Sequence, residues 1–194
     1  MQRIILASSS KQRKILMDAL NVPYEIIPAD INEKTIRDGN SVVMVEKIAR
    51  AKAEKVAFEN DAIVIAADSF AIYKRKVFEK PKTIEEARQM LRDLSDAKDA
   101  VDYTGFCYID RKNKIDYSKG LVINFSFRKL SDEEINGYVK KFPVLTWAGA
   151  FSPAYIYGLT ILSEIKGSVT GLTHGLPMEL LIPLLEKSGV KIKP

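Results

Sequence analysis

The stretch RIILASSSKQRKIL, residues 3–16, decides the fold of this chain. Its first part, from Ile4 to Ala7, is a short apolar run of the kind that forms a buried strand. Three serines follow, and after them the apolar residues Ile15, Leu16 and Leu20 recur with the spacing of a helix. A strand that leads through a short polar loop into a helix predicts an α/β fold.

The expected helix begins with an unusual charge pattern. Ser10 is a good N-cap, and Lys11, Arg13 and Lys14 follow it within the first turn or so. A helix N-terminus already carries partial positive charge, so each cation there costs a few tenths of a kcal/mol. A bound anion reverses this effect, because backbone N–H groups, serine hydroxyls and a cation then converge on it. The pattern favours a phosphate site, and the alternative is three long side chains that point into water.

The rest of the chain alternates strand-like and helix-like segments, which predicts a mixed sheet with helices on its faces. We expect strands at residues 3–8, 24–29, 62–73, 101–110, 114–127 and 159–165, and helices at about 10–20, 41–59, 83–94, 131–140 and 178–188. Two of these helices should start with capping boxes, one formed by Thr83 and Glu86 and the other by Ser131 and Glu134. The strands at 101–110 and 114–127 should pair antiparallel across a short turn. No repeat or linker interrupts the sequence, so we expect one domain over residues 1–194.

Composition excludes several classes of protein. The chain is 46% hydrophobic and 28% charged, as is ordinary for a soluble globular protein. Its longest apolar runs, such as residues 62–67, are too short to span a bilayer, and the N-terminus does not read as a signal peptide, so we expect a cytoplasmic protein without membrane contact. A lone cysteine, Cys107, excludes an internal disulfide and a multi-cysteine zinc site. The net charge of +5 is spread along the chain, which makes nucleic acid an unlikely partner.

Lys52 stands out in the helix expected at 41–59. Val45, Ile48, Ala49, Ala53 and Val56 form its apolar stripe, and Lys52 lies on that stripe, four residues after Ile48. A lysine on a buried face needs a partner or an opening to water. The alternative is a lysine stem that crosses the core edge and keeps its ammonium group solvated.

Asp68 is the sharpest single-residue signal in the chain. It lies inside the apolar strand expected at residues 62–73. A carboxylate there is costly unless it holds a metal, pairs with a cation or accepts a proton during catalysis. The alternative is a structural aspartate that is hydrogen-bonded near a strand end.

Other chemistries find little support. The chain has no GxxxxGK[ST], GxGxxG or HExxH motif, and its single histidine, His174, is expected in a loop before a helix. Glu79 and Lys80 lie next to each other in an extended segment before Pro81, and Glu33 lies in a loop. Cations and carboxylates therefore remain as the functional side chains. Such a set suits a polyphosphate that is bound together with a divalent metal.

Taken in order, several segments resemble the Maf family of nucleoside triphosphate pyrophosphatases. They are LASSSKQRKIL (6–16), AADSF (66–70), FEKPKTIEEARQMLRDLS (78–95), YTG (103–105), FRKLSDEEINGYV (127–139), WAGAF (147–151) and HGLP (174–177). The resemblance implies a mixed twisted sheet flanked by helices, with a deep cleft, in a homodimer. It also implies hydrolysis of nucleoside triphosphates to the monophosphate and pyrophosphate with a divalent metal, Mg or Mn.

The resemblance also implies roles for individual residues. Substrate binding falls to Ser8, Ser10, Arg13 and Ser69, where Ser69 replaces the threonine of the family. The catalytic set is Asp68, Lys52, Lys80 and Glu33, and the metal ligands are Glu33, Asp68 and Glu79. Asp68 or a metal-bound water would supply the attacking hydroxide, and Arg13, Lys52 and Lys80 would stabilise the charge on the phosphates.

The chain departs from the family at several positions, one pair in the first loop and the others in segments that include the one that reads the base. Lys11-Gln12 replaces Pro-Arg, Thr146-Trp147 replaces Asp-Lys, and SPAYIYG (152–158) replaces the segment that reads the base. The resemblance implies a house-cleaning pyrophosphatase that acts on non-canonical or modified nucleotides, and the departures leave its base preference open. The alternatives are a pyrophosphatase of the ITP/XTP type and a nucleotide-binding regulator of cell division with little turnover.

Overall fold

The computed structural model describes residues 2–192, and within them seven strands form one mixed sheet. The strands run in the order β2-β1-β3-β5-β6-β7, and β4 pairs with β3. Their bounds are Ile4–Leu6 (β1), Glu25–Ile26 (β2), Ile63–Tyr73 (β3), Lys76–Val77 (β4), Ala100–Asp110 (β5), Ile115–Phe127 (β6) and Leu162–Lys166 (β7). Strand β1 pairs parallel with β2 and β3, whereas β3 with β4 and β6 with β7 are antiparallel pairs. The predicted mixed sheet is confirmed.

Seven α-helices accompany the sheet in the described part of the chain. Their bounds are Lys11–Ala19 (α1), Ser41–Glu59 (α2), Ile84–Leu94 (α3), Asp132–Lys141 (α4), Ile156–Leu159 (α5), Val169–His174 (α6) and Met178–Lys187 (α7). None of the helices in residues 2–192 is both long and apolar enough to cross a membrane.

The chain divides into two compact units. Unit 1 comprises Met1–Ser69, Tyr103–Val122 and Ser168–Pro194, and unit 2 comprises Phe70–Asp102 and Ile123–Gly167. Strands β3, β5 and β6 contribute residues to both units. The single domain expected over residues 1–194 stays a prediction.

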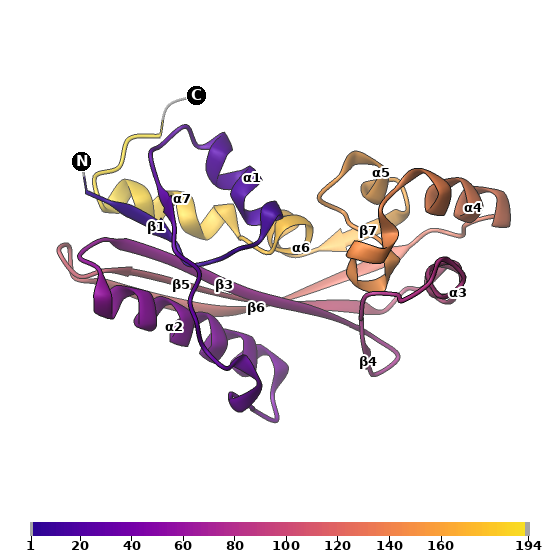
Figure 1. Cartoon of the computed structure of the whole chain (residues 1–194), viewed down its shortest axis with the longest axis horizontal. Helices are drawn as coiled ribbons and strands as arrows, with labels where there is room; N and C mark the ends of the chain where they lie inside the picture. Colours follow the sequence, from indigo (N-terminus) through magenta and orange to yellow (C-terminus); the bar gives the residue numbers. More distant parts are fainter. Residues whose placement is uncertain (1, 193–194) are drawn as a thin grey trace. The chain divides into compact units, whose positions relative to one another are not determined.

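Unit 1 has an apolar core on each face of its strands, because successive side chains of a strand point to opposite faces. On one face, β1, β3 and β5 pack against α1 and α7 through the residues Ile4, Leu6, Met17, Ile63, Ile65, Phe106, Tyr108, Leu181 and Leu185. On the other face they pack against α2 through Ile5, Ala7, Ala49, Ala53, Val56, Val64, Ala66, Cys107 and Ile109. Figure 1 shows α2 on one side of these strands and α1, α6 and α7 on the other.

Unit 2 is built around aromatic side chains. Phe78, Phe125, Phe127 and Phe151 pack with ring centroids 5.0–6.4 Å apart. Trp147 is buried and stacks on Tyr155 with centroids 5.3 Å apart. Helix α3 packs against α4, and the α4 N-terminus carries the complete capping box predicted from Ser131 and Glu134.

Some predicted elements differ from the structure. The strand expected at residues 24–29 is only Glu25–Ile26, because its neighbour β1 offers three residues for pairing. Strand β7 begins at Leu162 rather than near residue 159, since the short helix α5 occupies residues 156–159.

Two local predictions need correction. His174 ends helix α6 rather than lying in a loop, because Ser168 caps this six-residue helix by accepting the Gly171 N–H at 2.9 Å. The capping box at Thr83 is half formed. Thr83 accepts the Glu86 N–H, but the Glu86 carboxylate accepts the Lys82 N–H at 2.6 Å.

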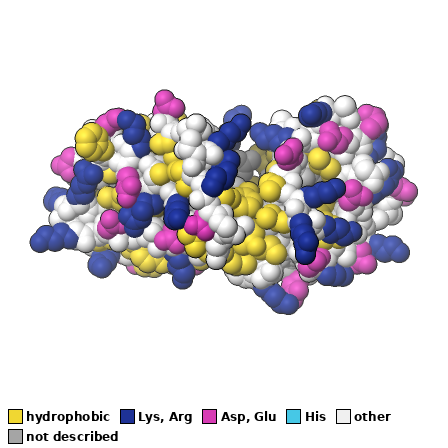
Figure 2. All heavy atoms as spheres, turned by 90° about the horizontal axis from the view of Figure 1, so that it is seen from below, with side chains coloured by type: hydrophobic (Ala, Val, Ile, Leu, Met, Phe, Trp, Pro, Cys, Tyr) yellow, Lys and Arg dark blue, Asp and Glu magenta, His cyan; other side chains and the backbone are white. Residues whose placement is uncertain are grey.

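The surface charge is interspersed rather than gathered. On the face drawn in Figure 2, Lys and Arg side chains alternate with Asp and Glu side chains over both units. Many of these charges form exposed pairs, such as Lys55 with Glu59 at 2.6 Å. Exposed pairs of this kind contribute little stability and leave no strong local field.

Candidate functional site

A pocket in unit 1 brings together most of the residues that the sequence singles out. We call it the serine pocket; it has a volume of about 170 Å³ and is lined by Ala7, Ser8, Ser9, Ser10, Arg13, Pro28, Ala29, Glu33 and Lys52. Its walls come from the loop after β1, the start of α1, the segment after β2 and helix α2. Three segments far apart in sequence therefore meet at polar side chains.

The loop after β1 is held in place by its own serines. Ser10 is the N-cap of α1, and its Oγ accepts the Arg13 N–H. Ser8 is buried, and its Oγ accepts the Ser10 N–H at 3.2 Å. These bonds place two hydroxyls and the first turn of α1 at the pocket, which is the arrangement that helix N-termini use for anions.

The three cations of this helix have different surroundings. Lys11 and Lys14 are exposed, and Lys14 pairs with Asp18 at 2.7 Å. Arg13 is 9% exposed, and its guanidinium donates from Nη1 to Ser8 Oγ at 2.9 Å and from Nε to the Gly175 carbonyl at 3.0 Å. The two lysines therefore lie at the surface, and of the three cations only Arg13 lines the pocket.

Lys52 lies on the buried face of α2, as its position on the apolar stripe predicts, and is 8% exposed. Its ammonium lies 2.8 Å from Asp68 Oδ1 and 2.7 Å from Glu33 Oε1. A buried ammonium is costly without partners, and two carboxylates supply them here. Lys52 thereby holds Asp68 and Glu33 close to each other, although they repel each other as like charges.

Asp68 and Ser69 are neighbours that face opposite sides of β3. The even-numbered residues Val64 and Ala66 face α2, so the pleat directs Asp68 to the side of Lys52. Ser69 points the other way, and its Oγ lies 3.5 Å from Arg13 Nη2. One dipeptide thus reaches both buried cations, one from each face.

Glu79 and Lys80 lie in unit 2 and are exposed. The Glu79 carbonyl accepts the Gly149 N–H at 2.8 Å, and Glu79 lines a pocket of about 520 Å³ between β4 and α3. Their predicted roles in metal binding and catalysis stay predictions.

A divalent metal fits the residues of unit 1 only with help from a substrate. Within residues 2–192, no three His, Cys, Asp or Glu side chains gather as a ready metal site. Asp68 and Glu33 are two carboxylates held together by one lysine. Mg²⁺ commonly takes one or two carboxylates and completes its shell with phosphate oxygens and water, so the pair suits a metal that arrives with a polyphosphate.

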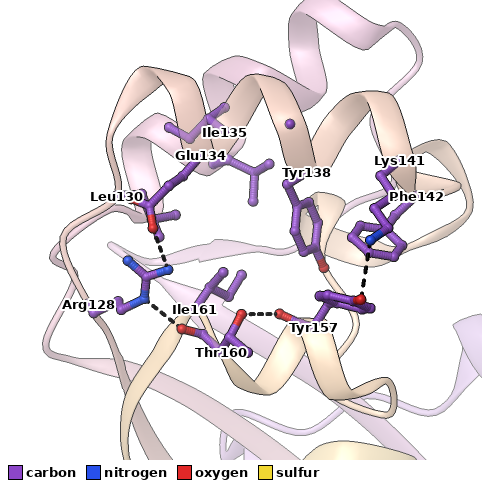
Figure 3. Close-up of a pocket in the computed structure, with 12 residues that line it drawn as sticks. Arg128, Leu130, Glu134, Ile135, Tyr138, Lys141, Phe142, Tyr157, Thr160 and Ile161 are labelled. Carbon is purple, nitrogen blue, oxygen red and sulfur yellow. Dashed lines mark hydrogen bonds and ion pairs between the residues drawn. The ribbon is translucent and has the colours of Figure 1, made fainter.

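Unit 2 holds a different pocket, drawn in Figure 3, which we call the ring pocket. It measures about 240 Å³ and lies between α4 and the segment around α5, with Tyr138, Phe142 and Tyr157 among its walls. Lys141 lies 4.4 Å from the centroid of the Tyr157 ring, and Arg128 pairs with Glu134 at 2.7 Å. Burial raises the pKa of the Tyr138 phenol to about 12, so this ring stays neutral. Tyr157, from the segment SPAYIYG (152–158) that differs from the family pattern, thus forms part of the aromatic wall of the ring pocket.

Sequence reasoning missed Gly175 as a site residue. The HGLP segment gave only a family resemblance, whereas the structure brings the Gly175 carbonyl to Arg13, 162 positions away in the chain. A glycine directly after a helix commonly adopts the left-handed conformation, and Gly175 does so with φ of 65°. A glycine in this cap position is the sequence signal that could have pointed to it.

Taken together, a serine loop at a helix N-terminus, two buried cations and a carboxylate pair form an arrangement of the kind that suits a phosphate ligand and its hydrolysis. The sequence as a whole identifies the family more narrowly. The model of the family described as Maf-like protein matches residues 3–188, and the chain belongs to this Maf family. The family prediction is confirmed.

Relatives match along nearly the whole chain. A dTTP/UTP pyrophosphatase of Ruminiclostridium cellulolyticum is 34% identical over 99% of this chain and 99% of its own. A 7-methyl-GTP pyrophosphatase of Nitrosococcus oceani is 31% identical over 97% of this chain and 94% of its own. Among solved structures, the Ham1 protein of Staphylococcus aureus superposes with a TM-score of 0.50 at 17% identity, over 96% of this chain and all of the other. The last match shows a shared fold.

Proposed function

We propose that this chain hydrolyses nucleoside triphosphates to nucleoside monophosphates and pyrophosphate. The observation that carries the proposal is the buried ammonium of Lys52, shared by Asp68 and Glu33 beside the serine loop. The relatives that match along the chain are named as pyrophosphatases of nucleoside triphosphates, which supports the same reaction.

Phosphate binding falls to the loop after β1 and the start of α1. The Ser8 and Ser10 hydroxyls and the Arg13 guanidinium offer donors to phosphate oxygens. The charge of Arg13, costly at a helix N-terminus alone, is favourable once an anion binds there. Arg13 suits this role because a guanidinium can donate two parallel hydrogen bonds to one phosphate.

Hydrolysis requires an attacking water and a stabilised leaving group. In this proposal Asp68 accepts a proton from the water through Oδ2, since Oδ1 contacts Lys52. The water oxygen bonds to the α-phosphorus, and the bond to the bridging oxygen of pyrophosphate breaks. Lys52 and Arg13 stabilise the negative charge that develops on the phosphates.

The proposal includes a divalent cation, Mg or Mn, held by Asp68 and Glu33, with Glu79 as a further predicted ligand. Such an ion would neutralise phosphate charge and lower the pKa of a bound water. Lys80, the homodimer and the cytoplasmic setting also belong to this proposal, and they rest on the family resemblance.

Substrate choice follows the departures from the family. The relatives are named for pyrimidine triphosphates and for a methylated guanosine triphosphate, and the segment at 152–158 differs from the family pattern. We infer a nucleotide house-cleaning role, with a base preference set by this segment.

The test is pyrophosphate release from dTTP, UTP, 7-methyl-GTP, ITP and the common triphosphates, each with Mg or Mn. Asp68→Asn should lower kcat by roughly 100-fold or more, because it removes the proton acceptor. Asp110→Asn is the matched control, since Asp110 is a fully buried carboxylate at the end of β5 and contacts Gln2 and Asn113 instead.

Triphosphate binding without turnover in the wild type would favour the regulator over the enzyme. If Asp68→Asn retains full activity while the wild type is active, Asp68 is not the base.

A further inference from the structure

Gly175 closes helix α6 in a conformation that favours glycine. Its φ and ψ are 65° and 27°, and its N–H donates to the Gly171 carbonyl at 2.9 Å. Glycine is the usual residue at this position, because it adopts the left-handed region without a Cβ penalty. Helix capping alone would therefore explain why a glycine stands at position 175, but it would not explain the side chains packed against it.

The surroundings of Gly175 belong to the phosphate-binding residues. Its carbonyl accepts the Arg13 Nε–H at 3.0 Å in a buried contact. A Cβ on Gly175 would lie 2.9 Å from Ser69 Oγ, 3.1 Å from Arg13 Nη2 and 3.4 Å from Arg13 Nε. The space that a side chain would take is thus filled by the Arg13 guanidinium and the Ser69 hydroxyl.

We propose that Gly175 is a positioning residue for Arg13, and this inference rests on the proposed function. Its carbonyl fixes the Nε edge of the guanidinium, and Ser8 Oγ accepts from Nη1 at 2.9 Å. A planar fork held at two points has its plane set before the ligand arrives, which lowers the entropy cost of binding. The α6 C-terminus thereby orients the cation at the α1 N-terminus, and both helices pack against each other.

The chain offers a matched control in Gly189, which follows helix α7. Gly189 also has a positive φ, 77°, and its N–H donates to the Glu186 carbonyl at 2.9 Å. A Cβ built on Gly189 meets nothing within 4 Å. An alanine at either position carries the same backbone strain, but only the one at 175 presses on Arg13.

The experiment compares Gly175→Ala with Gly189→Ala. Thermal unfolding reports the shared backbone strain, and calorimetry with inorganic tripolyphosphate reports anion affinity without any turnover. We expect both variants to lose stability through the strained backbone, and Gly175→Ala to lose more because its Cβ crowds Ser69 and Arg13. Gly175→Ala alone should weaken tripolyphosphate binding by roughly tenfold, as for the loss of one charge-assisted contact. In nucleotide hydrolysis kcat/KM should fall by at least the same factor, since Arg13 also stabilises the charge that develops during the proposed reaction.

A double-mutant cycle separates positioning from general damage. In an Arg13→Ala background, Gly175→Ala should leave tripolyphosphate affinity unchanged, because the group it positions is absent. Gly175→Asn and Gly189→Asn repeat the comparison if the alanine variant does not fold, since asparagine tolerates the left-handed region better.

Equal affinity losses at positions 175 and 189, or full additivity in the cycle, would overturn the positioning role. Wild-type protein that binds tripolyphosphate but releases no pyrophosphate from any nucleotide would instead contradict the proposed function and leave the affinity comparison intact.

Discussion

The serine pocket of unit 1 and the ring pocket of unit 2 both contain cations, but they hold them differently. Arg13 and Lys52 are at most 9% exposed, and each contacts polar groups from two or more segments. Arg128 and Lys141 stand at an accessible rim, where one pairs with Glu134 and the other covers the Tyr157 ring.

This difference in exposure indicates which pocket suits a charged ligand. A buried cation is costly, so a fold that fixes two of them beside a helix N-terminus suits an anionic ligand. An exposed cation over an aromatic ring is already solvated and contributes a small stacking energy. Unit 1 therefore suits the phosphates, whereas the ring pocket offers shape and flat apolar surface.

The largest expected effect comes from removing one cation from each unit, which tests whether only unit 1 binds the phosphates. Lys52→Met should lower kcat/KM for triphosphate hydrolysis by roughly 100-fold or more. In the proposed reaction the ammonium stabilises phosphate charge, and it also offsets the repulsion between the two carboxylates that it bridges. Lys141→Met should change the affinity for inorganic tripolyphosphate by less than about twofold, since its contacts are exposed. Steady-state kinetics and calorimetry measure the two effects.

Lys47→Met is the control within helix α2, where Lys47 is exposed and pairs with Asp38 at 2.7 Å. A loss of tripolyphosphate affinity in Lys141→Met as large as the loss in Lys52→Met would show that unit 2 also binds the phosphates.

A second variant asks whether unit 2 reads the base. Tyr157→Ala removes an exposed ring from the segment at 152–158, which differs from the family pattern. Stacking of a base on an aromatic side chain is worth about 1–3 kcal/mol, so we expect the ratio of kcat/KM between purine and pyrimidine triphosphates to shift by roughly tenfold. Tripolyphosphate affinity, measured in parallel, should not change. An unaltered ratio would place base reading elsewhere.

A third test uses the same cap chemistry in both units. Ser131→Ala at the α4 N-cap and Ser10→Ala at the α1 N-cap should each cost about 1 kcal/mol of stability in denaturant unfolding. Only Ser10→Ala should also lower kcat/KM, by several fold, since Ser10 lines the serine pocket. Equal activity of the two variants would reduce Ser10 to a helix cap.

The smallest expected effect is a difference in pH dependence. Burial lowers the pKa of His174 below its ordinary 6.5, so the unfolded chain binds this proton more readily. Stability should therefore fall as the pH drops below about 6.5, and His174→Gln should remove this dependence.

In unit 2 the hydrogen bond from Arg128, and then that from the Ser131 N–H, lowers the pKa of Glu134 from 4.5 to about 2. Its stabilisation is present above pH 4.5 and is lost as the pH falls toward about 2, a window that Glu134→Gln should abolish. Thermal unfolding across a pH series checks both windows, and identical profiles for the two variants would contradict the assignment.

Local patterns predicted the elements that carry the site. The α1 N-cap, the whole of α2 and most of β3 follow from capping residues and apolar spacing, both of which act within a few residues. Lys52 and Asp68 were each visible because a charge interrupts an apolar pattern. Helix α6 was missed, since its six residues have no apolar stripe.

The contacts between these residues were beyond local patterns. The bond between Lys52 and Glu33 joins α2 to the short 3-10 helix Glu33–Thr35, a segment that was expected to be a loop. The bond between Arg13 and Gly175 joins positions 162 apart. Neither can be read from spacing, because both depend on how the sheet brings distant segments together. The alternation of side chains along β3 predicts which face of the sheet Asp68 lies on, but it does not predict that Lys52 contacts Asp68 there.

The chain's only cysteine and only tryptophan fall in different units. Cys107 is fully buried in unit 1, and burial raises the pKa of its thiol to about 12, so alkylation should require that unit to open. Trp147 is buried against Tyr155 in unit 2, and its fluorescence should follow that unit. The natural protein thus carries two independent reporters, one for each unit. Comparing their denaturant midpoints would show directly whether the units unfold as one cooperative body or as two.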